Sequence, residues 1–194
     1  MFPNPTIPRT TSPKRAIGLI ELRSVARGML TTDAMLKAAD VELLRAHVVC
    51  PGKYIILIAG TISHVNNAIQ TGKQVAPDVV LDYFVLPNVH PSVFPALTAT
   101  TEIDEVKAIG VIETFTLAAA IVAGDTAVKA AQVNLIEIRL PFAMGGKAFC
   151  IFTGEVSAVR NAVNSAAEQM KEEGVIDSFV VIPAPHQGLI DKLL

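Results

Sequence analysis

An internal repeat restricts the possible folds of this chain more than any other feature. Residues 16–21 (AIGLIE) recur as residues 108–113 (AIGVIE), and the same offset carries Lys37 to Lys129. Beyond residue 50 the offset grows by two residues, so that Gly52 corresponds to Gly146. A repeat of this length exceeds a solenoid unit and suits a small domain.

We therefore predict two fused domains of the same fold. The first covers residues 16–97 and the second residues 108–194, joined by a linker at residues 98–107. Residues 1–15 contain four prolines and scattered basic residues, which predicts a flexible N-terminal tail.

The first half of each copy is expected to form a strand, a helix and a strand. Residues 16–22 are a short apolar strand, and Ser24, with Thr116 as its equivalent, caps the helix that follows. The apolar positions of this helix recur at helical spacing at Val25, Met29 and Leu36. Residues 41–49 then form a strand with polar residues interspersed.

The second half of each copy is expected to form a buried strand, a helix and a strand. Residues 54–59, like residues 148–152, are a continuous apolar run, and Ser63 caps the next helix. One face of that helix carries Val65, Ala68 and Ile69. A strand at 81–86 and a short helix at 91–97 complete the copy. The order β-α-β-β-α-β predicts an α+β, ferredoxin-like fold.

Composition excludes several classes of protein. Hydrophobic residues make up 51% of the chain, yet the richest apolar stretch, residues 116–124, is too short to span a membrane. Without a signal-peptide pattern we expect a cytoplasmic protein, with apolar surface buried between subunits. A net charge of −2 and 5% aromatic residues argue against nucleic-acid binding.

The two copies resemble bacterial microcompartment (BMC) shell proteins. The resemblance rests on the repeated opening strand, on residues 33–38 (DAMLKA), and on residues 86–90 (LPNVH) and 182–186 (IPAPH). It covers nearly the whole chain after residue 15, and two tandem domains resemble the trimer-forming class. The resemblance implies a homotrimer that forms a pseudohexagonal tile, other shell proteins as partners, and a place in the shell around enclosed, in part redox, enzymes.

The loop after the second strand carries a more specific resemblance. Residues 50–53 (CPGK), paired with 142–147 (FAMGGK), resemble the iron–sulfur tandem-domain shell proteins of propanediol-utilisation compartments. The family places this loop at the central pore of the tile. The offset between the copies also changes at this loop, where a loop end is free to vary in length. The expected pore-loop residues are Val49, Cys50, Pro51, Gly52, Met144, Gly145 and Gly146.

Cys50 is the candidate metal ligand. A three-fold axis would bring three thiolates together, and these suit a [4Fe–4S] cluster with one iron left for a non-protein ligand. They also suit Zn²⁺ with a water, and the spacing alone does not choose. Iron–sulfur is what the resemblance implies, with electron transfer or cluster delivery across the shell as its role. The competing interpretation is an ordinary loop thiol lining an open pore.

Two nearby features are expected to be structural. Cys150 lies in an apolar strand, so it is predicted to be a buried core residue. Gly145 and Gly146 could hold an anion with their backbone N–H groups, but they match no phosphate-loop pattern and favour a tight hairpin.

Five residues are expected at the tile edge. Lys37 and Lys129 each follow an aspartate four positions earlier, which predicts an intrahelical ion pair, and the family places the equivalent lysine against a neighbouring tile. His90 and His186 follow the fourth strand and are expected to be structural. Single-domain relatives usually carry Arg where this chain has Asn88 and Ala184, which predicts different lateral contacts.

These expectations define a structural shell protein, not an enzyme. Two rivals remain: an open-pore shell trimer that conducts small metabolites without a cluster, and a trimeric ferredoxin-like ligand-binding protein or enzyme that does not tile. No Ser/Asp or Cys/His arrangement for nucleophilic catalysis is readable in the sequence.

Overall fold

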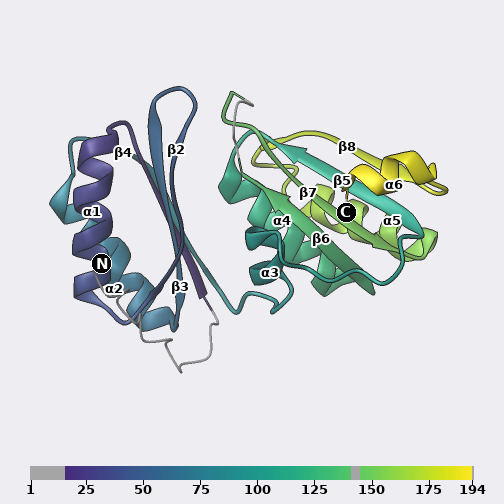
Figure 1. Ribbon diagram of the computed structural model, residues 1–194, viewed down its shortest axis with the longest axis horizontal. Coiled ribbons are helices and arrows are strands. Elements are labelled where there is room, and N and C mark those ends of the chain that lie inside the picture. Colours follow the sequence, from purple (N-terminus) through teal and green to yellow (C-terminus); the bar gives the residue numbers. More distant parts are fainter. Residues whose placement is uncertain (1–15, 141–144, 194) are drawn as a thin grey trace, which may run out of the picture. The chain divides into compact units, whose positions relative to one another are not determined.

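The computed structural model describes residues 16–140 and 145–193 (Figure 1). Two compact units make up this chain, one built on the first sheet and one on the second. Among the described residues, no helix combines the length and the apolarity needed to cross a membrane.

The first unit contains the predicted order of strands and helices. Its elements are β1 (Ala16–Leu22), α1 (Val25–Ala38), β2 (Glu42–Val49), β3 (Lys53–Gly60), α2 (Ile62–Val75) and β4 (Val80–Pro87). The sheet has the strand order β2-β3-β1-β4, and β1 runs antiparallel to both of its neighbours, with Leu19 opposite Leu57 on one side and Phe84 on the other. The α+β class and the ferredoxin-like fold are confirmed.

The second unit repeats this arrangement. Its elements are α3 (Val93–Thr98), β5 (Ala108–Thr114), α4 (Leu117–Ala130), β6 (Val133–Arg139), β7 (Ala148–Gly154), α5 (Val156–Gln169), β8 (Ile176–Ile182) and α6 (Gln187–Leu193). The strand order β6-β7-β5-β8 is equivalent to that of the first sheet. Helix α3 follows β4 in the sequence but packs on β6, so it belongs to the second unit.

A hydroxyl side chain caps the N-terminus of three of the long helices. Ser24 Oγ accepts the backbone N–H of Arg27 at 3.4 Å, and Thr116 Oγ1 accepts that of Ala119 at 3.1 Å, as predicted. Helix α2 begins two residues earlier than expected. Thr61 has an extended backbone and accepts the His64 N–H at 3.4 Å, whereas Ser63 already lies in the first helical turn.

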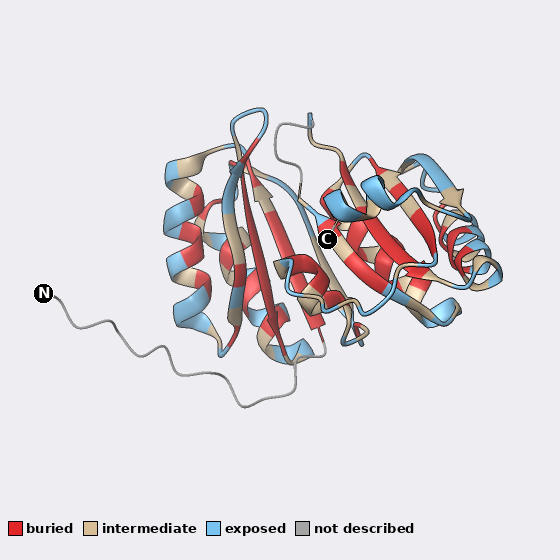
Figure 2. Cartoon of the chain, turned by 45° about the vertical axis from the view of Figure 1, so that its right-hand side comes forward, coloured by how far each residue is buried: buried red, intermediate tan, exposed pale blue. Residues whose placement is uncertain are grey.

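The core of the first unit lies between the sheet and its two helices (Figure 2). Val65, Ala68 and Ile69 of α2 are buried in it, as predicted. Of the apolar positions noted in α1, Val25 packs against this core, whereas Met29 and Leu36 are exposed. The buried positions of α1 are instead Gly28, Thr31, Thr32 and Met35.

Close packing explains which face of α1 is buried. A Cβ atom at Gly28 would lie 2.3 Å from Cδ1 of Tyr54, so the helix backbone lies directly against the aromatic ring on β3. Only a residue without a side chain permits this approach, and the small residues of the helix therefore face the sheet.

The second core contains the same kind of close contact. Gly110 on β5 lies against Phe152 of β7, where an added Cβ would meet Cε2 at 2.4 Å. Cys150 on β7 is fully buried, which confirms its predicted place in the core. A separate cluster on this sheet, formed by Ile109, Ile136 and Ile151, is covered in part by Ile103 and Val106 of the segment before β5 and by Leu193.

Candidate functional site

Cys50 lies at the tip of the hairpin between β2 and β3. Its side chain is exposed and its thiol is free. Pro51 follows, and Gly52 has a φ of 68°, a left-handed conformation that favours glycine and closes the turn. No atom lies within 4 Å of the position that a Gly52 Cβ would occupy. The hairpin therefore holds the thiol at the surface of the chain.

The equivalent hairpin joins β6 and β7. Gly145 and Gly146 have φ values of 64° and 97°, which agrees with the predicted turn and uses the conformational freedom of both glycines. Met144, the other pore-loop residue predicted here, lies outside the described residues.

A lysine–glutamate pair fixes the start of the third strand in both copies. Lys53 Nζ lies 2.6 Å from Glu21 Oε1, and its equivalent Lys147 lies 3.4 Å from Glu113 Oε1. Lys147 also donates to Asp177 at 2.8 Å, and this hydrogen bond is the main cause that raises the pKa of Lys147. Sequence analysis did not identify this pair, although the repeat contains all four residues.

Cys150 is not suited to bind a metal. Burial raises the pKa of its thiol to about 12, so the thiolate that metals bind is not formed near neutral pH. Across residues 16–140 and 145–193, no cluster of three or more His, Cys, Asp or Glu side chains could hold a metal ion. A metal on Cys50 would therefore need thiolates from other copies of the chain.

The two lysines expected at the tile edge form the intrahelical pairs that their spacing predicted. Lys37 Nζ contacts Asp33 Oδ2 at 2.6 Å, and Lys129 Nζ contacts Asp125 Oδ2 at 2.5 Å. The two aspartates differ in environment. The side chain of Asp33 is 58% exposed, and that of Asp125 is 7% exposed.

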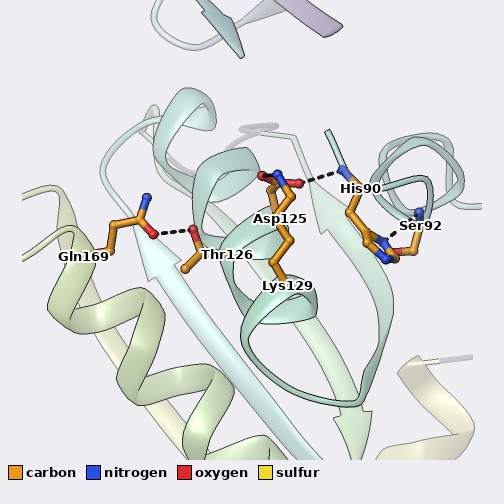
Figure 3. Close-up of polar contacts among 6 residues, drawn as sticks. All are labelled: His90, Ser92, Asp125, Thr126, Lys129 and Gln169. Carbon is orange, nitrogen blue, oxygen red and sulfur yellow. Dashed lines mark hydrogen bonds and ion pairs between the residues drawn. The ribbon is translucent and has the colours of Figure 1, made fainter. Parts of the chain in front are cut away.

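The buried Asp125 has a second partner that sequence analysis missed. Its Oδ1 accepts the backbone N–H of His90 at 2.7 Å, and the His90 ring lies 2.8 Å from Ser92 Oγ (Figure 3). The nearby Asn88 has a φ of 52°, a turn conformation that precedes this contact. The signal was present in the repeat, because Asp33/Asp125 and His90/His186 occur at equivalent positions.

His186 repeats only the local part of this arrangement. Its Nδ1 accepts the backbone N–H of Gly188 at 3.1 Å, as His90 Nδ1 accepts that of Ser92 at 3.3 Å. Both histidines therefore stabilise the turn before a short helix.

A duplicated βαββαβ fold, with a distinct hairpin in each copy, defines a tandem-domain α+β protein. The sequence profile of the BMC domain matches residues 16–89 and again residues 108–185. The chain belongs to the BMC-domain family.

Three relatives describe the range of the similarity. The bacterial microcompartment shell protein PduT of Citrobacter freundii is 43% identical over 175 residues, which cover 90% of this chain and 95% of that protein. A crystal structure of a microcompartment protein from Desulfitobacterium hafniense matches with a TM-score of 0.90 and 48% identity, over 92% of this chain and 99% of the other. The shell protein EutM of Salmonella typhimurium is 37% identical over 83 residues, covering 43% of this chain and 84% of EutM.

Proposed function

We propose that this shell protein is a trimeric tile that holds a [4Fe–4S] cluster at its three-fold axis through Cys50 of each chain. The observation that carries the proposal is the exposed, free thiol at the tip of the β2–β3 hairpin. A closed ring turns one such thiol per chain into a convergent set of ligands.

The donor set fits the cluster. Three thiolates can ligate three irons of a [4Fe–4S] cluster, and the fourth iron is then open to another ligand. Pro51 and Gly52 form a turn that presents the Cys50 thiol beyond the ends of the strands. When bound, the cluster would supply one-electron transfer, and its placement in a tile suits passage of electrons, or of clusters, across the shell.

We infer a structural role and not an enzymatic one. The relatives are described as shell proteins, and the carboxysome protein CcmO of Synechococcus elongatus, 29% identical over 97% of this chain, as an assembly protein. Relatives of this kind support other shell proteins as partners. Enclosed redox enzymes are the proposed electron partners of the cluster.

Anaerobic purification tests the cluster. We expect a brown protein with about four irons and four sulfides per trimer, as a [4Fe–4S] centre requires. Cys50→Ser should abolish the colour and the iron, whereas the matched control Cys150→Ala should retain both. Stoichiometric zinc in place of iron would assign the site to Zn²⁺ and contradict the cluster.

The same preparation separates the competing functions. A wild-type protein that stays free of metal after anaerobic reconstitution with iron and sulfide would support an open-pore tile and remove the redox role. Electron microscopy distinguishes a tile from a discrete trimer, because a shell component should form flat sheets at high concentration. Trimers that never associate laterally would favour the ligand-binding alternative.

A further inference from the structure

Helix α3 shows how a helix that follows one copy of the repeat covers the next copy. It packs on β6 and α4, and its residues Val93, Ala96 and Leu97 are buried. The backbone N–H of His90, just before the helix, donates to the buried Asp125 of α4 at 2.7 Å (Figure 3). The contact therefore combines apolar burial with a hydrogen bond to a carboxylate, which is one of the stronger kinds of hydrogen bond.

Helix α6 is the equivalent docking segment, but it lacks the equivalent surface. Among the described residues it buries none of its side chains, although Leu193 contacts its own sheet. Leu189, the equivalent of the fully buried Val93, is 40% exposed. The backbone N–H of His186 finds no acceptor among the described residues, although the turn around it is the one seen at His90.

Strand β2 and helix α1 are the first-copy equivalents of β6 and α4, and within the described residues their own unit contains no docking segment like α3 or α6. Asp33, the equivalent of Asp125, bonds Lys37 through Oδ2, and within the described chain no donor reaches its Oδ1. Met29 of α1 is 58% exposed, whereas its equivalent Ile121 is fully buried. Further exposed apolar residues of α1 and β2 are Leu30, Leu36, Leu43 and Val48.

One chain thus carries a docking segment and a matching surface, each without its partner. We propose that a second copy of this chain covers α1 and β2 with its α6, and that the His186 backbone N–H of that copy donates to Asp33 Oδ1. The contact is heterologous, since different surfaces meet, and such contacts form closed rings when the rotation allows. The inference rests on the trimer of the proposed function and assigns the residues that join its subunits.

Association of the intact chain tests this contact. Sedimentation velocity over a dilution series should show that Asp33→Ala weakens trimer formation about ten-fold or more per interface, because it removes a hydrogen bond to a charged group. The matched control is Lys37→Ala, which breaks the same exposed ion pair but leaves the Asp33 carboxylate in place. It should associate like the wild type.

Two further measurements separate a lost contact from a misfolded chain. Leu189→Gln, on the other side of the proposed interface, should weaken association while the circular dichroism spectrum stays unchanged. Hydrogen exchange at the His186 amide should be slow in the wild-type trimer and fast in Asp33→Ala.

The outcomes distinguish this inference from the function on which it rests. A wild-type trimer whose stability is unchanged by Asp33→Ala, with rapid exchange at His186, would overturn the docking contact alone. A wild-type chain that stays monomeric at every concentration would overturn the trimeric tile as well.

Discussion

Asp125 accepts the backbone N–H of His90 and the side-chain ammonium of Lys129 while its own side chain is almost completely buried. A buried carboxylate is stable in a protein only when such partners replace its hydration. The His90 contact joins α4 to the turn before α3, and the Lys129 contact lies within α4, so both elements depend on Asp125.

Asp125→Ala should therefore destabilise the fold. Loss of the carboxylate leaves the His90 N–H without its acceptor, and the expected decrease in the free energy of unfolding is about 1.5–3 kcal/mol. Urea denaturation followed by circular dichroism measures it. The control is Glu168→Ala, which removes an exposed pair with Lys171 on the same unit and should have almost no effect. Equal midpoints for the two variants would contradict the role of Asp125.

Gly28 and Tyr54 should be energetically coupled. Gly28→Ala forces a methyl group into the Tyr54 ring and should cost about 1–3 kcal/mol of stability. In the second copy the position of Gly28 is Ala120 and that of Tyr54 is Ala148, so a helix alanine occurs there together with a small strand residue in place of tyrosine. In a Tyr54→Ala background the Gly28→Ala change should cost much less. A double-mutant cycle without coupling would contradict this packing.

The buried Cys150 should make stability depend on alkaline pH. The folded chain keeps the thiol proton to about pH 12, whereas the unfolded chain releases it near pH 9.0. The unfolded state therefore binds fewer protons in this window, and the free energy of unfolding should fall as pH rises, by at most about 1.4 kcal/mol per pH unit. Because other groups also titrate there, the measurement is the difference between wild type and Cys150→Ala, which should shrink between pH 9 and 12. A constant difference would be inconsistent with a buried thiol.

Lys37 and Lys129 should contribute to lateral contacts between tiles. We expect the double variant Lys37→Ala/Lys129→Ala to form trimers but fewer or smaller flat sheets, as seen by negative-stain electron microscopy. Lys171→Ala removes an exposed lysine from the turn that follows α5 and serves as the control. Sheets of normal size from the double variant would show that these lysines do not contribute to lateral contacts between tiles.

The repeat made most of the fold predictable. It placed β1 at its observed bounds and gave the element order of both copies, because the apolar runs of one copy recur in the other. The start of α2 was missed because Thr61 and Ser63 are both good caps, and only the backbone conformation distinguishes them.

The remaining errors concern packing between elements. Helical spacing identified Met29 and Leu36 as one apolar stripe, but periodicity alone does not say whether a stripe faces its own sheet or another surface. The close approach of Gly28 to Tyr54 decided this, and it depends on two residues distant in the sequence. The His90–Asp125 bond was missed because its donor is a backbone N–H: the repeat shows that both residues recur, but not that they meet.

Covalent fusion of the two copies frees each hairpin from having to match the other. In a ring of identical single-domain subunits, any mutation at a hairpin is repeated at every position around the axis. In this chain one hairpin ends in Cys50-Pro51-Gly52 and its counterpart in two adjacent glycines, so evolution could specialise one without altering the other. Divergence after duplication thus lets the two hairpins carry different chemistry while the fold of the two copies stays the same.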